Sequence, residues 1–428
     1  MEDLWGYRIA VKANEKCRKS CIRASRHGCL IYDRSYYEVV LLEAPDWERL
    51  ASFIPAEDLG RLQVFCKESN VSGYKLGTSL FRDQDGQIVG PVEMVMRSNT
   101  MAMLVHPCIT SSITSCLSQS GIQFALNRGE WAIFDFQGAQ TIELIQRIVK
   151  PCAIDLAQAV EAHETWAIDP RLQASPDQDI CPNQQCSPGT FWDLDFQKRH
   201  GEGRKSRHQL DQLCAQQAVP GTKLIATQAD PLMPVLFLKQ SGPSNRISLI
   251  VHGQWGLIVW RAFLFAGARF AGLEELSVVN LESSRPTFPQ DYPIAKEAFK
   301  SYLDIYASRW EDKWDRTPPA KRINYEKIGL ALPFRLDLSL LAASPESHPR
   351  IVRIEMDGKG VPEHNARVYH NGQLIGLVTS GGYSQVYGKG IGFATCIIPD
   401  SVDGKAKVQV QNINCLITRP AALLLDLT

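Results

Sequence analysis

The pattern of hydrophobic and polar positions predicts alternating strands and helices between residues 36 and 150. Short apolar runs typical of strands are separated by segments in which apolar residues recur at helical spacing. Asp85-Gly86 separates two of these runs, which is a hairpin signal. We expect strands at residues 37–42, 74–82, 87–96, 101–106 and 131–136, and helices at 46–53 and 141–149. This alternation indicates an α+β architecture.

The last part of the chain, residues 350–428, has a different pattern in which nearly every segment is typical of a strand or a turn. Asn371-Gly372 is a strong type I′ hairpin signal between two alternating runs. We expect strands at residues 351–356, 366–370, 373–379, 391–398 and 405–411. With about six short strands in this region, the pattern predicts a small antiparallel barrel or sandwich.

The central stretch, residues 252–275, is the most distinctive apolar segment of the chain. Leu257, Trp260, Leu264 and Ala268 recur at helical spacing, and Ile258, Phe265 and Gly272 recur more loosely. We expect strands at 234–239 and 246–251 before this segment, and a helix within 291–310 after it.

Arg261 and Arg269 are embedded in this apolar segment. A buried guanidinium that lacks a partner is costly, so each arginine needs either an internal acid or an external anion. We favour the first interpretation, in which both arginines brace the fold rather than contact a ligand.

A basic helix is predicted near the N-terminus, with Asn14 as its N-cap and Gly28 just past its end. Cys17, Cys21 and Ala24 fall on an apolar face. Five cations spaced by three and four residues form the other face: Lys12, Lys16, Lys19, Arg23 and Arg26. Such a stripe is often only a solvated surface, but charges of one sign over an apolar back favour a polyanion ligand.

Two further basic segments are candidates for nucleic-acid contact. The first lies among glycines and is expected to be a flexible loop, which either stays solvated or orders on a phosphate backbone; its cations are Lys198, Arg199, Arg204, Lys205 and Arg207. In the second, two prolines favour an extended chain, and an exposed aromatic among cations suits phosphates and an unstacked base; its residues are Lys321, Arg322, Tyr325 and Lys327. The alternative for the second segment is a linker that packs Tyr325.

Composition limits the classes of function. The chain has 428 residues, enough for two or three domains, and its net charge is zero, so any nucleic-acid binding must come from local patches. We expect neither a membrane span nor a signal peptide, since the longest apolar segment is interrupted by arginines.

The 12 cysteines include no CxxC pair, which favours reduced thiols. No spacing of Cys and His fits a standard zinc site, so no metal ligand is predicted.

No catalytic residue is predicted. The sequence lacks the GxSxG, HExxH and GxxxxGK[ST] signatures. Gly388-Lys389-Gly390-Ile391-Gly392 has neither the spacing of a phosphate loop nor a following helix. The histidines lie far apart in the sequence, and none has an acid or a nucleophile at a spacing typical of a catalytic site. They are therefore expected to be structural.

Several stretches resemble, in the same order, the largest protein subunit of eukaryotic ribonuclease P and ribonuclease MRP. The N-terminal block matches at Trp5-Gly6-Tyr7, Arg23-Ala24, Cys29-Leu30 and Ser35-Tyr36-Tyr37. The POPLD segment matches at Trp255-Gly256, Gly267-Ala268-Arg269 and Gly272-Leu273-Glu274-Glu275, and the string from Arg316 to Lys327 matches another specific motif. A basic region precedes the first block in the family, and we expect this chain to lack it, either as a fragment or as a short form.

The resemblance implies an α+β fold with glycine-cleavage T-protein-like α/β modules, a central POPLD segment and a small C-terminal antiparallel β-barrel. We divide the chain accordingly into a basic helix with an α+β module (1–165), a loop-rich connection (166–222), a POPLD-type segment (223–345) and a β-barrel (346–428).

The resemblance also implies a function. The protein is expected to be a non-catalytic RNA-binding scaffold in the nucleus and nucleolus, where the holoenzymes remove 5′ leaders from precursor tRNA and process precursor rRNA. Its expected partners are the two catalytic RNAs and smaller protein subunits, with Mg²⁺ bound by RNA and no cofactor bound by the protein. The alternative from the T-protein likeness is a folate-dependent aminomethyltransferase-like enzyme, although a shared fold does not imply shared chemistry.

Overall fold

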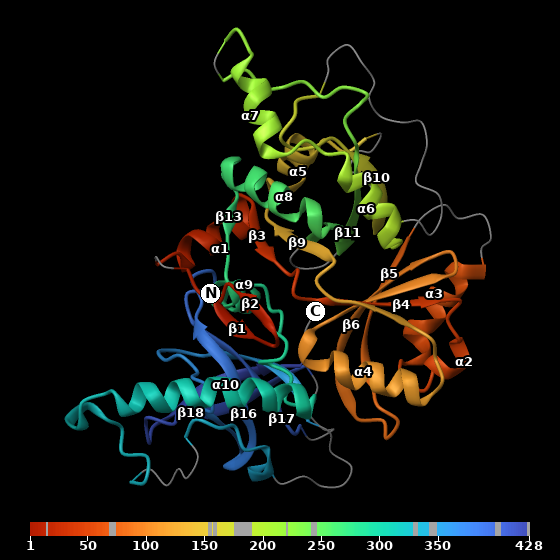
Figure 1. Cartoon of the computed structure of the whole chain (residues 1–428). Coiled ribbons are helices and arrows are strands. Elements are labelled where there is room, and N and C mark those ends of the chain that lie inside the picture. The colour runs from red at the N-terminus through yellow and green to blue at the C-terminus, as the bar shows by residue number, and fades with distance from the viewer. Residues whose placement is uncertain are drawn as a thin grey trace. The chain divides into compact units, whose positions relative to one another are not determined.

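The computed structural model describes residues 1–13, 16–67, 74–152, 156, 161–174, 191–219, 221–240, 246–327, 333–341, 349–398 and 404–425. The chain forms two compact units (Figure 1). The first comprises Met1–Gly86 and Pro91–Leu276, and the second comprises Gln87–Gly90 and Ser277–Thr428. The finer division into four sequence segments stays a prediction.

The first unit contains two sheets and a small N-terminal hairpin. The six-stranded sheet has the order β10-β11-β12-β9-β3-β13 and is antiparallel except where β13 pairs with β3. Its strands are β3 (Leu30–Asp33), β9 (Trp131–Gln137), β10 (Ala162–Ala167), β11 (Met233–Gln240), β12 (Arg246–His252) and β13 (Arg269–Phe270). The five-stranded sheet has the order β5-β6-β7-β4-β8, with β4 (Glu38–Glu43), β5 (Lys75–Arg82), β6 (Ile88–Arg97), β7 (Thr100–Val105) and β8 (Ala125–Asn127). The hairpin consists of β1 (Glu2–Leu4) and β2 (Tyr7–Ile9).

The helices confirm some of the sequence predictions and correct others. The predicted helix at 141–149 is α5 (Thr141–Val149), and the one at 46–53 is the shorter α2 (Trp47–Leu50). Among the described residues, five α-helices were not predicted: α3 (Ala56–Lys67), α4 (Pro107–Gln119), α6 (Leu194–Glu202), α7 (Arg207–Ala215) and α9 (Leu273–Glu282). The prediction of a flexible loop through residues 198–207 was therefore wrong. The signals were present, because Asp193 caps α6 and Ser206 forms a capping box with Gln209 on α7.

Both faces of the six-stranded sheet are buried, which explains why its strands lack a clear alternation of apolar and polar residues. Along β9, Ala132, Phe134 and Phe136 pack under α5 and α8 (Gly253–Phe265). Trp131 and Ile133 point the other way, into a cluster that includes residues of β4, β6 and β7 from the five-stranded sheet. The two sheets of the first unit therefore pack face to face.

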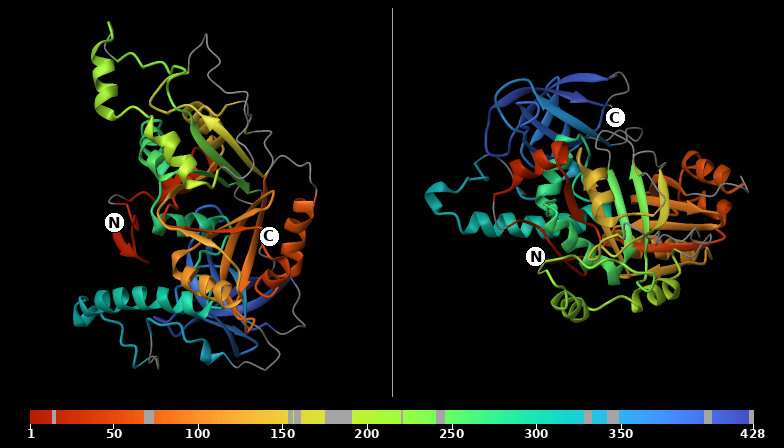
Figure 2. Two further views of the ribbon diagram at one scale, coloured as in Figure 1. Left: turned by 45° about the vertical axis from the view of Figure 1, so that its right-hand side comes forward. Right: turned by 90° about the horizontal axis from the view of Figure 1, so that it is seen from above.

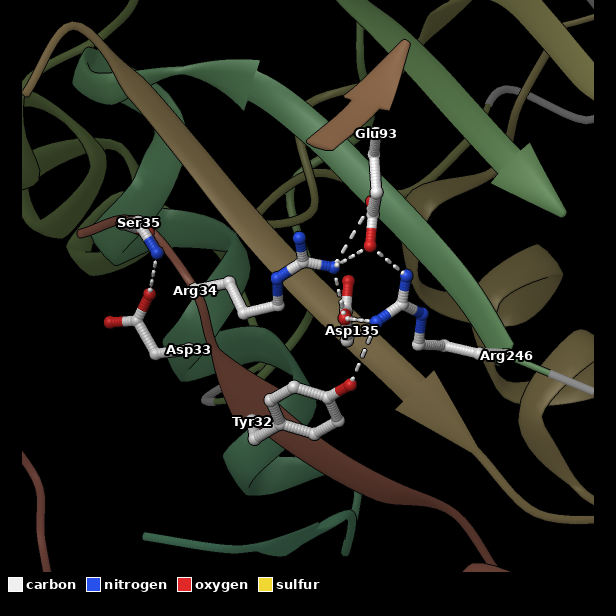
Figure 3. Close-up of polar contacts among 7 residues, drawn as sticks. All are labelled: Tyr32, Asp33, Arg34, Ser35, Glu93, Asp135 and Arg246. Atoms are coloured by element: carbon white, nitrogen blue, oxygen red, sulfur yellow. Dashed lines mark hydrogen bonds and ion pairs between the residues drawn. The ribbon is translucent and has the colours of Figure 1, made fainter. Parts of the chain in front are cut away.

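Four charged side chains form a cluster between these two sheets, in which Arg34, Asp135 and Arg246 are buried and the Glu93 side chain is 17% exposed (Figure 3). One Asp135 carboxylate oxygen lies 2.8 Å from Arg34 Nη1 and 3.0 Å from Arg246 Nη1. Glu93 on β6 lies 3.2 Å from Arg34 and 2.5 Å from Arg246. Tyr32 adds a hydrogen bond from the Arg246 guanidinium to its hydroxyl, 3.4 Å away. Residues of β9, β12 and the end of β3 are thereby joined to β6 of the other sheet.

The cluster has no net charge, because two guanidinium groups face two carboxylates. Its stability depends on this balance of charge. Burial alone would raise the pKa of Glu93 and of Asp135, but Arg246 and Arg34 outweigh burial and lower both values. Burial opposes the charge of Arg34, yet Asp135 and Glu93 raise the pKa of that guanidinium. All four groups therefore stay charged, and removing one leaves an uncompensated charge in the core.

Arg246→Met is expected to lower the free energy of unfolding by about 3–5 kcal/mol, because Asp135 and Glu93 would then share one cation. The measurement is urea unfolding. Arg207→Met is the matched control, since the Arg207 side chain is 81% exposed beside Asp211, and a change within about 0.5 kcal/mol is expected. A loss below about 1 kcal/mol for Arg246→Met would show that the cluster is not required.

The second unit is a closed six-stranded barrel with a long helix along it (Figures 1 and 2). The strand order is β14-β17-β16-β15-β18-β19, with β14 (Arg350–Met356), β15 (Arg367–His370), β16 (Gln373–Tyr383), β17 (Gly390–Cys396), β18 (Lys405–Gln411) and β19 (Thr418–Leu424). The helix α10 (Lys296–Asp315) packs through Phe299, Tyr302 and Leu303 on Leu377 of the barrel. The expected antiparallel barrel is confirmed, and the hairpin at Asn371 and Gly372 has both residues at positive φ, as a type I′ turn requires.

His364 of the second unit is a half-buried histidine that is held neutral. Its ring lies 4.3 Å from the Trp310 ring, and Nδ1 lies 2.7 Å from the Thr379 carbonyl. Burial lowers the pKa of His364 to about 4, although the hydrogen bond opposes this change. Below its ordinary pKa of 6.5 the unfolded chain binds a proton that the folded chain does not bind.

The free energy of unfolding is therefore expected to fall as the pH drops from about 6.5 towards 4, by up to about 1.4 kcal/mol per pH unit for this group. His364→Gln keeps an N–H donor but never takes up a proton, so its loss of stability over this window should be shallower than that of the wild type. Urea unfolding at a series of pH values measures both slopes, and equal slopes would contradict the assignment.

Within the described ranges, every helix is too short or too polar to span a lipid bilayer.

Candidate nucleic-acid interface

The basic helix α1 (Arg18–His27) is fixed at both ends by close backbone approaches. Before the helix, Leu273 N–H donates to the Ala10 carbonyl at 3.0 Å, and Glu274 N–H donates to the Val11 carbonyl at 2.8 Å. A Cβ on Gly272 would lie 2.8 Å from the Val11 oxygen, so the Gly-Leu-Glu-Glu motif needs its glycine. The N-terminal block and the POPLD-like segment therefore fit together, although about 260 residues separate them in sequence.

The other end of α1 rests on the turn between β9 and α5. Gln140 N–H donates to the Gly28 carbonyl at 2.9 Å. Gly138 has φ +123°, and a Cβ there would lie 2.3 Å from the Gly28 oxygen. Only glycine fits this position, which sets the helix against the six-stranded sheet.

The structure keeps part of the predicted basic stripe and corrects the rest. The helix begins at Arg18 with Cys17 as N-cap, while Asn14 and Glu15 lie outside the described residues. Lys12 and Lys16 are exposed but precede the helix. Three exposed cations share the surface of α1 and are named here the α1 face: Lys19, Arg23 and Arg26.

The surroundings of α1 agree with the expected apolar side but include an acid that was not expected. Cys17 and Cys21 are buried on the opposite side of α1, as expected. The stripe is not free of acids, because Glu274 lies 4.0 Å from Lys12 and 3.9 Å from Arg18. The α1 face has no carboxylate partner among the described residues, so its charge is available to a ligand.

A second basic surface is a pocket of about 1170 Å³ in the first unit, between α5, α8 and the connection from α6 to α7. We name it the α8 pocket. Its basic lining residues are Arg147, Lys150, Arg171, Arg204, Lys205, Arg207, Lys223 and Arg261, and Asp211 is the one acid in its lining. Three of the predicted cations are thus brought together here, whereas Lys198 and Arg199 lie on α6 outside the lining.

The packing of α6 on α8 places the pocket's cations. Gly201 lies so close to Gln254 that a Cβ would approach the amide oxygen to 1.7 Å. Directly afterwards, Arg204 lies over the Trp255 ring at 5.7 Å and donates to the Gln254 carbonyl. Trp255 itself is fully buried, so the guanidinium is anchored on a rigid part of the core.

Some cations of the pocket are paired with acids and others are not. Arg171 binds Asp169 at 2.7 Å, Lys205 binds Asp230, and Arg207 lies 3.8 Å from Asp211. Lys150 and Arg204 donate to the carbonyls of Leu172 and Gln254 and are partly compensated by Asp169. Three cations of the lining have no carboxylate partner among the described residues: Arg147, Lys223 and Arg261.

The neighbouring positive charges of the pocket contribute to lowering the pKa values of its own basic groups. The pKa of Lys150 is lowered by burial and then by Lys223. The pKa of Arg204 is lowered by burial and then by Arg171. Both groups would gain from a bound anion, which would offset the repulsion between neighbouring cations.

The two central arginines have different roles, and one expectation was wrong. Arg269 contacts the Cys17 and Cys21 thiols, which raise its pKa, and so braces α1 as expected. Arg261 is exposed, lines the α8 pocket and has no carboxylate partner among the described residues, so it does not brace the fold.

The third predicted segment packs back on the end of α10. The Arg322 guanidinium lies 4.9 Å from the Trp314 ring and donates to the carbonyls of Asp315 and Thr317. Tyr325 is partly buried, with ring centroids 6.3 Å from Trp314 and 5.5 Å from Phe334. The expectation of an exposed aromatic was therefore wrong. Lys321 and Lys327 remain exposed.

Sequence reasoning missed Arg147, Lys150, Arg171 and Lys223. They come from separate segments, and only the fold brings them to one pocket. Among the described residues, no group of three or more His, Cys, Asp or Glu is arranged to hold a metal ion. Eight described cysteines are free, in agreement with the expectation of reduced thiols, whereas Cys152 is disulfide-bonded and departs from it.

Three family models match the chain in sequence order. Residues 1–45 match the N-terminal domain of the ribonucleases P/MRP protein subunit POP1, and residues 246–338 match the POPLD (NUC188) domain. Residues 350–420 match the C-terminal barrel domain of the glycine cleavage T-protein.

Individual relatives agree with these matches. The ribonucleases P/MRP protein subunit POP1 of Homo sapiens is 29% identical over 35% of this chain and 15% of the human protein. The corresponding subunit of Saccharomyces cerevisiae is 21% identical over 76% of this chain and 44% of the yeast protein. The chain thus spans less than half the length of either relative.

The solved structure of the glycine cleavage system aminomethyltransferase T from Bartonella henselae shares the fold. It has a TM-score of 0.52 and 11% identity, covering 99% of this chain and 91% of that chain. The expected T-protein-like fold is confirmed, and at this identity the likeness concerns the fold alone. The chain is therefore similar in sequence to the POP1 protein subunits of ribonucleases P/MRP, and it shares the fold of the glycine cleavage T-protein.

Proposed function

We propose that this chain is an RNA-binding scaffold subunit of ribonuclease P and ribonuclease MRP. In this role it braces the catalytic RNA during 5′-leader removal from precursor tRNA and during precursor rRNA processing. The observation that carries the proposal is the concentration of cations in the α8 pocket and on the α1 face, many of them without a carboxylate partner in the described part of the chain, although the net charge of the chain is zero. A polyanion such as RNA supplies the missing counter-charges.

The proposal gives the protein positioning and charge neutralisation rather than chemistry. In the holoenzyme, Mg²⁺ bound by the RNA would activate water for phosphodiester hydrolysis, and this chain would hold no cofactor. Its partners would be the ribonuclease P and ribonuclease MRP RNAs, precursor tRNA and smaller protein subunits, in the nucleus and nucleolus. The names of the relatives support the assignment to these two ribonucleoproteins.

The first test is binding to ribonuclease P RNA across a salt series, with Lys19, Arg23 and Arg26 replaced by Ala. The variant is expected to bind more weakly, and its plot of log affinity against log salt should be shallower by about two to three units, because up to three phosphate contacts are lost. The control variant replaces three exposed lysines of the barrel unit, Lys359, Lys405 and Lys407, and should keep the wild-type slope.

Equal losses in both variants would mean that net charge alone governs binding, which would contradict a specific role of the α1 face. Wild-type protein that binds ribonuclease P RNA no better than an arbitrary RNA of the same length would contradict the scaffold function itself.

The alternative function, a folate-dependent aminomethyltransferase-like enzyme, is favoured only by the shared fold. It gives no role to the cations of the α1 face or the α8 pocket. Titration with tetrahydrofolate, followed by tryptophan fluorescence, separates the two functions. We expect no saturation in the micromolar range, and saturable binding there would favour the enzyme.

A further inference from the structure

The α8 pocket combines its cationic rim with an apolar wall that solvent reaches. Leu257, Ile258, Ala262 and Phe265 line this wall on one side of α8. Leu257 is 59% exposed and Phe265 is 86% exposed. Large apolar side chains exposed together on a rigid helix indicate an interaction site, because the exposure of their apolar surface to water is unfavourable.

This wall is not a by-product of a loosely packed helix. The inward side of α8 carries Trp255, Val259 and Phe263, which are all fully buried at successive intervals of four residues. The helix is therefore anchored on the sheet by one set of apolar residues and presents a second set to the pocket. Core packing accounts for Ile258, which is partly buried against the sheet, but it does not account for the exposed Leu257 and Phe265.

The charges of the pocket specify what kind of ligand fits. Lys223 and Arg261 are exposed cations without a carboxylate partner among the described residues, and Arg204, which lines the same pocket, is held by the core. A ligand with a flat apolar part and negative groups around it satisfies both halves of the site. An unstacked nucleotide has this chemistry, whereas a duplex hides its bases and presents only phosphates.

We propose that the α8 pocket captures an unpaired nucleotide of the bound RNA. The base lies against Leu257 and Phe265, and the adjoining phosphates contact Arg204, Lys223 and Arg261. This inference rests on the proposed RNA-binding function and adds to it a preference for single-stranded segments. Recognition of one exposed base would fix the register of the RNA on the protein, which phosphate contacts alone do not do.

The test compares fluorescein-labelled oligouridylate of about ten nucleotides with a duplex of the same length, by fluorescence anisotropy on the full chain. Phe265→Ala is expected to weaken oligouridylate binding about tenfold, the effect of losing one stacked base, and to leave duplex binding unchanged. Leu264→Ser is the matched control, because Leu264 is 50% exposed on the same helix but does not line the pocket.

A second variant probes the rim. Lys223→Ala with Arg261→Ala should weaken oligouridylate binding and reduce its salt dependence by about one to two units. Neither residue is buried, so both variants are expected to fold, and circular dichroism checks this. Oligoglutamate, an acidic peptide, is titrated in the same assay to test whether the pocket binds an acidic protein segment instead of RNA.

The outcomes separate this inference from the function on which it rests. Unchanged oligouridylate affinity in Phe265→Ala, with ribonuclease P RNA still bound, overturns the nucleotide pocket and leaves the scaffold function standing. Binding of oligoglutamate that depends on Phe265, without binding of oligouridylate, also overturns it and assigns the pocket to an acidic protein partner. Failure of the wild type to bind any RNA overturns the scaffold function.

Discussion

The neutral cluster of Arg34, Glu93, Asp135 and Arg246 is the constraint on which the first unit depends. It lies between two sheets whose facing surfaces are largely apolar, where Arg97 and Glu164 form a second ion pair, so its charges are shielded from water and must satisfy one another. Apolar contacts bring the sheets together but tolerate small shifts, whereas four charges at ion-pair distances do not. The cluster therefore fixes the register of β9 and β12, and α5 and α8 pack on the opposite face of these strands.

The packing of α5 and α8 on the six-stranded sheet determines where the basic surfaces lie. Glycines at 138, 201 and 272 allow backbone or side-chain approaches that a Cβ would block, and each one seats a basic element on the sheet or on α8. Cations that belong to distant segments thus line one pocket, and Arg204 among them is held on the core by Trp255 and Gln254. Because Arg204 is already ordered, it would lose less side-chain entropy on binding than a freely solvated arginine.

Sequence patterns predicted the elements whose neighbours are local. The type I′ turn at Asn371-Gly372 and the helix Thr141–Val149 follow from short-range rules. The hydrophobic pattern predicted the α+β class and a small barrel or sandwich, and the resemblance added the likeness to the T-protein. The loop prediction for residues 198–207 failed because glycine content was weighted above the caps Asp193 and Ser206. The predicted apolar stripe of α8 also proved misleading, since Leu257 and Leu264 face outward while Trp255, Val259 and Phe263 form the buried side. In a helix that is apolar all round, periodicity does not identify the inner face.

The candidate site was only partly predictable for a related reason. Arg204, Lys205 and Arg207 form a visible basic run, but the residues that complete their pocket come from α5, from the segment after β10 and from the segment before β11. Conversely, Arg322 and Tyr325 had a suggestive sequence context, yet they pack on α10 because Trp314 offers them a surface. Charge and aromatic content indicate a possible interface, and tertiary packing decides which residues remain available to it.

The most direct measurement is crosslinking of 4-thiouridine-labelled ribonuclease P RNA to the chain, with the modified peptides identified by mass spectrometry. The account predicts crosslinks within α1 and at residues 257–265 of α8, with the latter arising from uridines that are unpaired in the RNA. Crosslinks that fall only on other surfaces, or that an arbitrary RNA reproduces with equal yield, would contradict it.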